Sequence, residues 1–377
     1  MSLGTRIYAE LRGDKVIWAI LAVLAMFSIL IVYSSTGTLA YQNKGGNTEF
    51  YLLKHVIILS FGLVLTYFAF LLHYERYKIA APYLILLAIP LLMYTIFMGS
   101  DINEARRWIS VPGVGVTFQS SDFAELALVI YLARELTKKK EYIKDFQSAF
   151  LPLILPVILI CSLIAPADLS TAVVLFTTCI AMMFMGRVAL QYIGLLAALG
   201  VVAFAFLSLI GDFFPDVVRI ETWIQRFSAF TNGTGDNYQI DQSKIAIANG
   251  ELIGVGPGNS IQRNFLPQPY SDFVYAIIIE EYGLMGGFFI MLLYIMLFVR
   301  TTRLVTKSQK TFGAMVAIGL STMLVLQALM NMAVSVNLVP VTGLTMPIIS
   351  MGGTSLLFTC LSFGIILSVS KHVELKR

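Results

Sequence analysis

The chain has 377 residues, of which 58% are hydrophobic and only 13% are charged. Apolar runs of about 18 or more residues recur, and each is long enough to span a hydrocarbon core of about 30 Å. This composition excludes a soluble globular domain and predicts an all-α polytopic membrane protein. The formal net charge of +4 does not indicate a nucleic-acid partner, because basic residues also mark cytoplasmic loops, and we expect none.

The three cysteines, Cys161, Cys179 and Cys360, all lie in apolar runs. We interpret them as buried hydrophobic residues without a disulfide framework. The three histidines are scattered along the chain, so the sequence predicts no His/Cys metal cluster.

The hydropathy pattern predicts ten membrane spans in one integral-membrane domain that covers residues 1–377. The first run follows Arg12 and Lys15 and lacks a clean A-x-A cleavage site, so we interpret it as an uncleaved span and not as a signal peptide. The predicted spans are residues 16–34, 53–73, 77–98, 118–136, 149–165, 169–187, 189–212, 272–299, 312–335 and 345–370.

The distribution of basic residues predicts the orientation. With the N-terminus inside, 18 of the 26 Lys and Arg residues fall on inner segments and 8 on outer ones. Basic residues are enriched in cytoplasmic loops, so both termini are expected in the cytoplasm. On this topology two outer loops are long, at about 99–117 and about 213–271.

The loop 213–271 begins with DVVRIETWIQRFSAF, in which apolar residues recur at helical spacing between charges. This pattern predicts a helix that lies in the membrane interface. Arg219, Arg226 and Lys244 give this face cations. They either solvate the loop and meet lipid headgroups, or hold a pyrophosphate, whose geometry an arginine matches in a bidentate way.

Residues 254–287 form the junction between this polar loop and the eighth predicted span, and they carry Asp272, Glu280 and Glu281. Irregular backbone exposed to lipid is not tolerated at membrane depth, so the junction should line a polar cavity or lie at the membrane surface. In a helix that starts at Asp272, the two glutamates would lie roughly 12–13 Å deeper, at about 1.5 Å per residue.

Two glycine-containing stretches predict irregular backbone. Gly254, Gly256 and Gly258 follow no strand, so a nucleotide loop is disfavoured, and close backbone approach to a substrate or a neighbouring helix is the better interpretation. The second stretch lies between the last two spans, where a kinked connection needed for packing and a substrate contact both stay open. Its residues are Asn337, Pro340, Gly343, Pro347, Gly352 and Gly353.

Four stretches, at residues 105–133, 237–260, 266–287 and 337–357, resemble the signature segments of the SEDS family. These are the shape, elongation, division and sporulation proteins, which include FtsW and RodA, and overall likeness favours the FtsW branch. The resemblance implies a glycosyltransferase that polymerises lipid II into peptidoglycan at the outer face of the bacterial inner membrane. The implied setting is cell division or elongation, and the division septum if the chain is FtsW-like.

The resemblance also implies partners and cofactors. A class B penicillin-binding protein, a single-span transpeptidase, would cross-link the new glycan, alongside other division or elongation proteins. No cofactor is certain. Mg²⁺ or Mn²⁺ is compatible with the family, and Asp272 would then be a metal ligand instead of the catalytic base.

The family's essential acid matches Asp272 in the PYSDF context, although Tyr270 stands where the family usually has histidine. Asp122 keeps a carboxylate after Phe118-Gln119, but Glu125 replaces the family's lysine. Together with the cations of the large outer loop, these comparisons give the candidate substrate-binding residues as Arg219, Arg226, Lys244, Asp122, Glu125, Asp168, Ser271, Asn259 and Ser260.

Chemistry from the residues alone is compatible with this activity. Glycan polymerisation needs a base for the acceptor hydroxyl and cationic support for the departing diphosphate. An aspartate with the unperturbed pKa of about 3.9 is a poor base at neutral pH, but burial beside other carboxylates raises that pKa. Asp122, Glu125 and Asp168 lie at outer span ends with Asp272. The alternative role for Asp122, Asp168 and Asp272 is a helix N-cap.

Two other functional classes stay open at this stage. A flippase for the lipid-linked precursor also needs intramembrane carboxylates and a polar cavity, but transporters often contain repeated broken helices, and we detect no internal repeat. A non-catalytic scaffold for division proteins is the third interpretation.

Overall fold

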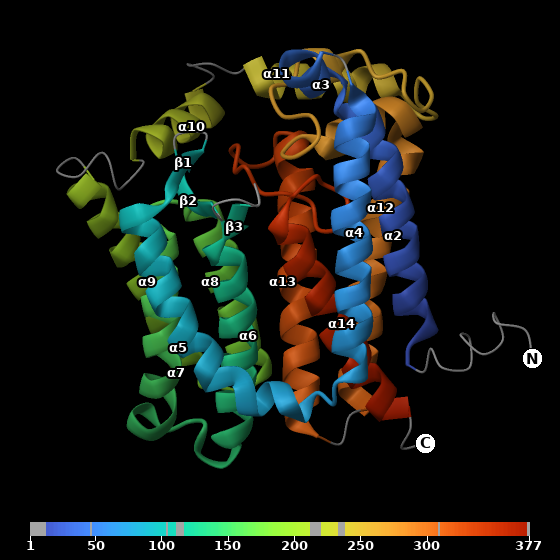
Figure 1. Ribbon diagram of the computed structural model, residues 1–377. Coiled ribbons are helices and arrows are strands. Elements are labelled where there is room, and N and C mark those ends of the chain that lie inside the picture. The colour runs from blue at the N-terminus through green and yellow to red at the C-terminus, as the bar shows by residue number, and fades with distance from the viewer. Residues whose placement is uncertain are drawn as a thin grey trace, which may run out of the picture.

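The computed structural model describes residues 13–45, 47–102, 105–110, 117–211, 220–232, 238–307 and 310–374. Ten helices in this part of the chain occupy the positions of the ten predicted spans (Figure 1). They are α2 (Lys15–Ser35), α4 (Thr48–Leu71), α5 (Glu75–Met98), α6 (Ser120–Lys138), α7 (Leu151–Ile164), α8 (Leu169–Met185), α9 (Leu190–Gly211), α12 (Val274–Lys307), α13 (Thr311–Ser335) and α14 (Thr354–Glu374).

Seven helical segments of the described chain are long and apolar enough to cross a membrane, and the apolar parts of α8 and α9 are shorter. The prediction of an all-α polytopic membrane protein is confirmed, while the number of crossings stays a prediction. In the most apolar window of α13 78% of residues are buried, and in that of α14 67%, against 28% in α4 and α5. The helices α13 and α14 therefore form the centre of the bundle, and α4 and α5 form its outer surface.

The helix α6 carries Asp122, Glu125, Arg134 and Glu135, which a lipid-facing helix would not tolerate. It packs against α5 and α13, and most of its residues from Ser120 to Leu136 are buried. Glu125 and Glu135 are therefore buried within the protein.

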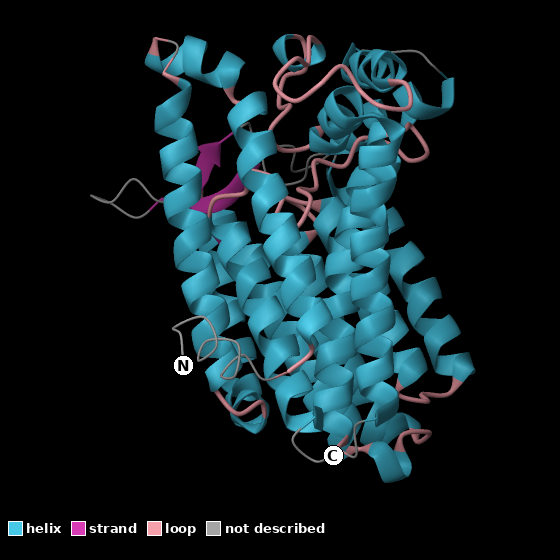
Figure 2. Ribbon diagram, turned by 90° about the vertical axis from the view of Figure 1, so that its right-hand side faces the viewer, coloured by secondary structure: helices cyan, strands magenta, loops and turns pink. Residues whose placement is uncertain are grey.

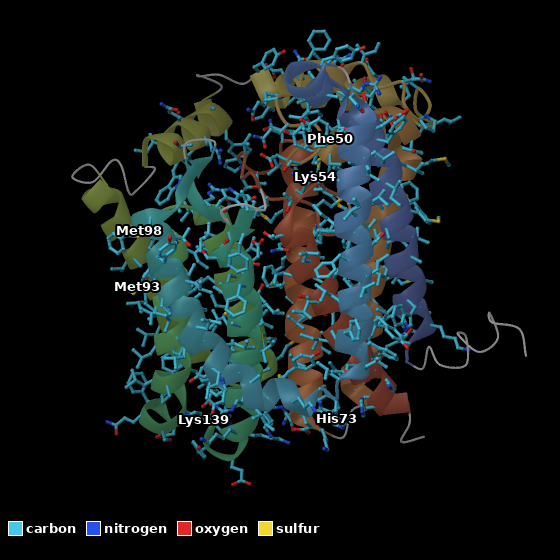
Figure 3. The ribbon with its side chains drawn as sticks, in the orientation of Figure 1. Phe50, Lys54, His73, Met93, Met98 and Lys139 are labelled. Atoms are coloured by element: carbon cyan, nitrogen blue, oxygen red, sulfur yellow. The ribbon has the colours of Figure 1, made fainter. Side chains whose placement is uncertain are left out.

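The two ends of the bundle differ (Figure 1). The short helices α3 (Gly37–Lys44), α10 (Ile220–Asn232) and α11 (Tyr238–Gly250) cover one end. At the other end Asp14, which caps α2, pairs with Arg300 of α12 at 2.7 Å, and Lys139 and His73 lie at this same end (Figure 3). The described part of the loop 213–271 therefore lies at one end of the bundle. The start of α2 and the end of α14 lie at the opposite end.

A small antiparallel sheet occupies the segment predicted as the loop 99–117 (Figure 2). Its strands are β1 (Ser100–Ile102), β2 (Ala105–Ser110) and β3 (Thr117–Gln119), in the order β1-β2-β3. Trp108 pairs with Gln119, so the sheet connects the end of α5 to the start of α6. Strands this short carry almost no periodic signal, which explains why the sequence predicted a loop.

The last helix begins later than predicted. The sequence placed the tenth span at 345–370, but α14 starts at Thr354. Residues 339–353 are irregular apart from short turns, because Pro347 lacks an amide hydrogen and Gly343 and Gly353 adopt positive φ angles of 78° and 55°.

The helix α12 is broken at Gly283, whose φ of 71° and ψ of −179° are not helical. The carbonyls of residues 280–281 accept hydrogen bonds from the amides of residues 255–256 at 2.9 and 3.0 Å. The amides of residues 284–285 donate to the carbonyls of residues 251–252 at 2.9 and 3.2 Å. The segment after α11 thus satisfies the backbone groups that the break releases.

The glycines of this segment allow the contact. A Cβ on Gly250 would lie 2.0 Å from the carbonyl oxygen of Ile279, and one on Gly254 would lie 2.3 Å from that of Glu281. The close backbone approach predicted for the glycine run is therefore made to α12.

We expect Gly283→Ala to lower the unfolding temperature in detergent more than Gly258→Ala. Both glycines have a left-handed φ, which costs another residue about 1–2 kcal/mol, but a Cβ at Gly283 would also lie 2.3 Å from the Leu252 carbonyl oxygen, whereas Gly258 has open space around it. Equal losses in the two variants would contradict the backbone contact.

The orientation predicted from the basic residues can be tested by cysteine labelling in intact cells. Asp241 on α11 and Lys140 after α6 are both exposed, and we expect an impermeant thiol reagent to label Asp241→Cys but not Lys140→Cys. Lysed cells provide the control, because both positions should then react. Labelling of Lys140→Cys from outside would reverse the orientation.

Candidate active site

Asp272 lies just before α12, at the end of the bundle that carries α10 and α11. The residue is largely buried, and its Oδ1 accepts a hydrogen bond of 2.8 Å from the Ser271 hydroxyl. Within the described residues this carboxylate bonds to a side chain and not to an amide of α12. Asp272 is therefore not the N-cap that the alternative interpretation required, and its second oxygen stays available.

The irregular segment 339–353 passes over this carboxylate. A Cβ on Gly343 would lie 3.6 Å from Oδ2 of Asp272, so the segment approaches the acid without covering it. The sequence left open whether this glycine serves packing or the site, and the structure places it beside the candidate acid.

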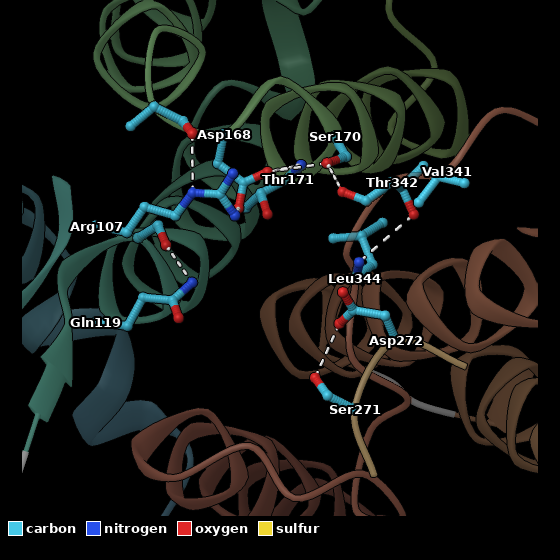
Figure 4. Close-up of polar contacts among 12 residues, drawn as sticks. Arg107, Gln119, Asp168, Ser170, Thr171, Ser271, Asp272, Val341, Thr342 and Leu344 are labelled. Carbon is cyan, nitrogen blue, oxygen red and sulfur yellow. Dashed lines mark hydrogen bonds and ion pairs between the residues drawn. The ribbon is translucent and has the colours of Figure 1, made fainter. Parts of the chain in front are cut away.

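Across from Asp272, the sheet holds a second charged group (Figure 4). Arg107 on β2 donates from Nη1 to Asp168 Oδ2 at 2.8 Å and from Nε to the Ala167 carbonyl at 2.8 Å. The other oxygen of Asp168 accepts from the amide of Thr171 at 3.2 Å, so Asp168 caps α8. The N-cap interpretation therefore holds for Asp168, which also orients Arg107.

Arg107 was absent from the residues proposed from the sequence, which counted it only among the outer basic residues. Its partner lies 61 positions away, and periodicity cannot predict such a pairing. The available signal was its place within the segment 105–133 that resembles the family.

The segment before Gly343 links the remaining elements of the site. The Ser170 hydroxyl lies 2.7 Å from the Thr342 carbonyl and 2.9 Å from Asp168. Arg226 of α10 donates from Nη1 to the carbonyls of Val341 and Thr342 at 3.2 and 3.3 Å. The predicted cation Arg226 is thus held at the site by the same irregular segment that passes Asp272.

A cavity of about 1210 Å³ opens beside these groups, between α7, α8, α9, α10 and residues 339–342. Apolar side chains such as Ile158, Phe176 and Leu196 line most of it, and Arg107 and Arg226 contribute its only charged groups within the described chain. A cavity of this size and lining suits an apolar ligand with an anionic head.

Burial raises the pKa of Asp272 above its ordinary value. The Ser271 hydrogen bond and the positive charges of Arg226 and Arg107 lower that pKa in part, and Asp168 raises it slightly. The net upward direction makes Asp272 a better proton acceptor than an exposed aspartate.

The acids of α6 lie deeper. Glu125 is buried and accepts a hydrogen bond of 2.8 Å from Gln327 of α13, so the glutamate that replaces the family's lysine has a neutral partner. Asp122 lies in the first turn of α6 and is not its N-cap. One oxygen of Asp122 is buried without a hydrogen bond in the described chain.

Other predicted substrate-binding residues have different surroundings. The buried Ser260 donates to Glu280, whose side chain also accepts from the amide of Gln262 at 3.3 Å. The exposed Asn259 donates to the carbonyl of Val255 at 3.1 Å. Both residues hold the loop before α12 together, and neither lines the cavity.

Of the remaining predicted cations, Lys244 forms an ion pair of 3.8 Å with Asp241, with about half of each side chain exposed. It does not line the cavity, and Arg219 lies outside the described residues. Glu281 is buried and accepts from the Ser34 hydroxyl, so this glutamate joins α12 to α2.

Among the described residues, no group of three or more His, Cys, Asp or Glu side chains is placed to hold a metal ion. Asp272 could contribute one carboxylate, which suits Mg²⁺ only when substrate phosphates supply further oxygen ligands.

The chain matches a known protein family and resembles several known proteins. The profile of the FtsW, RodA and SpoVE family, described as cell cycle protein, matches residues 14–375. The chain belongs to this family. It is similar to the probable peptidoglycan glycosyltransferase FtsW of Geobacter sulfurreducens, with 32% identity over 99% of each chain. It is also similar to the stage V sporulation protein E of Bacillus subtilis, with 30% identity over 95% of this chain and 96% of that one.

Two solved structures share the fold. One is a chain from a structure titled "Structural coordination of polymerization and crosslinking by a peptidoglycan synthase complex", with a TM-score of 0.74, 22% identity and coverage of 96% of this chain and 98% of that chain. The other is the rod shape determining protein RodA of Thermus thermophilus, with a TM-score of 0.67, 22% identity and coverage of 95% and 96%. The family fold therefore extends over nearly the whole chain.

A double-mutant cycle tests the Arg107–Asp168 pair. Removing one partner of a buried pair costs up to about 3–5 kcal/mol, because the other charge stays buried. We expect Arg107→Gln to lower the free energy of unfolding, and Asp168→Asn, which keeps a capping oxygen, to recover part of that loss in the double variant.

The exposed Lys244–Asp241 pair is the matched control, and Lys244→Ala should change the free energy of unfolding by no more than about 1 kcal/mol. Strictly additive effects of Arg107→Gln and Asp168→Asn would show that the two residues do not interact.

Proposed function

We propose that this protein is a peptidoglycan glycosyltransferase that polymerises lipid II at the outer face of the bacterial inner membrane. The observation that carries the proposal is that Arg107 and Arg226 line a large apolar cavity and that Asp272, which does not line this cavity, lies near enough for the charges of both arginines to lower its pKa. Lipid II combines an apolar polyprenyl tail, a diphosphate and sugars; the apolar lining of the cavity matches the tail, and the two arginines match the diphosphate. The curated relatives named FtsW support the proposal, and favour a role in cell division at the septum.

In the proposed reaction an acceptor sugar hydroxyl attacks the anomeric carbon of the donor. The new bond joins that carbon to the acceptor oxygen, while the bond to the diphosphate oxygen breaks. Asp272 accepts the hydroxyl proton, because it is the carboxylate with an uncommitted oxygen beside Gly343. The bonding electrons leave with the polyprenyl diphosphate, which then carries three negative charges, one more than in the donor, and Arg107 and Arg226 stabilise this added charge.

The apolar lining gives the lipid tail its place. Side chains of α7, α8 and α9 supply most of the apolar lining of the cavity. A polyprenyl chain there leaves its diphosphate at Arg226 and Ser170, which also line the cavity. A divalent ion bound by Asp272 and phosphate oxygens would add positive charge at the diphosphate.

We further propose that a class B penicillin-binding protein cross-links the glycan that this protein makes. One solved structure of the same fold is, by its title, part of a complex in which polymerisation and cross-linking are coordinated. The multi-pass fold places the protein in a membrane, and peptidoglycan synthesis assigns that membrane as the bacterial inner membrane.

Purified protein in liposomes, supplied with labelled lipid II and the transpeptidase partner, tests the activity. A glycosyltransferase produces glycan polymer, a flippase moves the monomer across the bilayer without joining it, and a scaffold does neither. Only the first result supports the proposal.

Replacing Asp272 by Asn keeps the size of the side chain but removes the basic oxygen. General-base loss costs about 10²–10⁴-fold in rate, so we expect polymerisation to fall by that factor while insertion and partner binding stay normal. Near-normal glycan synthesis by this variant would exclude Asp272 as the base.

The same assay can test the expected pH dependence of the polymerisation rate. A general base works only when deprotonated, so the rate should fall as the pH drops through the pKa of Asp272. Because burial raises that pKa, the acid limb should lie above the pH expected for an exposed aspartate, whose pKa is about 3.9. A rate that is constant down to pH 4 would contradict this assignment.

Replacing Arg226 by Ala should raise the lipid II concentration needed for half-maximal rate. A charge-assisted hydrogen bond contributes about 1.5–3 kcal/mol, and Arg226→Lys, which keeps the charge, should lose less. Lys244→Ala is the control, since Lys244 does not line the cavity. Equal effects of Arg226→Ala and Lys244→Ala would remove Arg226 from the binding site.

A further inference from the structure

Three consecutive carbonyls immediately before α12 are each held by a different donor. The Tyr270 carbonyl accepts from the amide of Met351 at 2.9 Å, and the Ser271 carbonyl accepts from the Ser350 hydroxyl at 2.9 Å. The Asp272 carbonyl accepts from the Asn331 side-chain amide at 2.9 Å. All three donors come from α13 or from the irregular segment that follows it.

These carbonyls need outside partners because they precede the helical ladder. The first local acceptor of α12 is the Phe273 carbonyl, which binds the amide of Ala276 at 3.1 Å. Residues 270–272, which we call the acid turn, therefore depend on donors from elsewhere in the fold.

The donors are fixed in turn. The Ser350 hydroxyl also accepts from the amide of Met346 at 2.8 Å, and Asn331 also donates to the Leu344 carbonyl at 2.7 Å. The exposed fractions of Asn331 and Ser350 are only 1% and 2%. Each side chain thus ties the acid turn to residues 344–346, the same segment that continues from Gly343 beside the carboxylate.

A second layer holds that segment from the other side. Ser28 of α2 donates to the Ile348 carbonyl at 2.6 Å and contacts Nε2 of the buried His55 at 2.8 Å. The Tyr294 hydroxyl donates to the Pro347 carbonyl. Ile348 has a φ of 68°, which a β-branched residue adopts only when its surroundings impose it.

We propose that Asn331 and Ser350 are positioning residues that set the location and direction of the Asp272 carboxylate. The inference rests on the proposed function, because it assigns them to Asp272 as the base. Neither side chain contacts the carboxylate: they act through the backbone of the acid turn. A shift of about 1 Å in a catalytic group can cost on the order of 10²-fold in rate, so loss of either bond should reduce turnover more than substrate binding.

Ser350→Ala removes one hydroxyl, and Asn331→Leu removes the amide at similar volume. Matched controls are Ser362→Ala on α14 and Ser321→Ala on α13, whose hydroxyls donate to carbonyls of their own helices, at Phe358 and Ile318. The assay measures kcat, the half-saturating lipid II concentration and the pH dependence of the rate, all with the full-length protein in liposomes with its partner.

We expect Ser350→Ala and Asn331→Leu to lower kcat about tenfold or more, with less than a twofold change in half-saturation. The acid limb of the pH profile should move to lower pH, because a loosened carboxylate is better solvated. The control variants should behave like the unmodified protein. Ser350→Thr, which keeps a hydroxyl, should have a kcat higher than that of Ser350→Ala.

An unchanged kcat and pH profile in Ser350→Ala would overturn the proposal, as would equal losses in the control variants. A lower amount of folded protein with an unaltered kcat and acid limb would also overturn it, because that result describes a purely structural role. Failure of the proposed function is a separate outcome, since it requires Asp272→Asn to retain activity.

Discussion

The constraint on which the structure depends is that backbone groups at membrane depth must be satisfied within the protein. The chain leaves helical geometry at three places around the site: at Gly283, in residues 339–353 and in the acid turn. At each place a neighbouring segment supplies the missing partners. Residues 251–256 pair with the broken α12, and Asn331, Ser350 and Met351 pair with the acid turn.

The same rule explains the distribution of charge. Asp168 has two tasks, because one carboxylate oxygen caps α8 and the other holds Arg107. Glu280 accepts from Ser260 and so connects the loop before α12 to that helix, and Glu281 accepts from Ser34 and connects α12 to α2. Asp272 differs from these acids: a single hydroxyl binds it, and arginines act on it only through their charge. Asp272 therefore keeps one carboxylate oxygen without a hydrogen-bond partner in the described chain, which suits it to accept a proton.

In the proposed complex the arginines bind the anionic head of the ligand, and the apolar lining of the cavity binds its tail. Arg107 and Arg226, which both line the cavity, come from two different elements, β2 and α10. Arg226 reaches the carbonyls of Val341 and Thr342, while Ser170 approaches the latter from α8. An anionic head would thus meet groups from several elements, and an apolar tail would meet α7 to α9.

The sequence by itself determined the fold class, the approximate positions of the ten helices, apart from the start of α14, and the acid at the junction with α12. These features depend on local composition, because a run of apolar residues must form a helix in lipid whatever surrounds it. The glycine run also carried a local signal, although only its contact with α12 explains it.

Only the tertiary structure decided which residues meet. Arg107 was missed because its partner Asp168 lies in another element, and the short strand that carries Arg107 has no periodicity to detect. Ser260 and Lys244 looked equivalent to Arg226 in the sequence, yet Ser260 supports Glu280 and Lys244 faces Asp241. The sequence did not predict a role for Asn331. Its role depends on two carbonyls, those of Asp272 and Leu344, which only the fold brings to its side-chain amide.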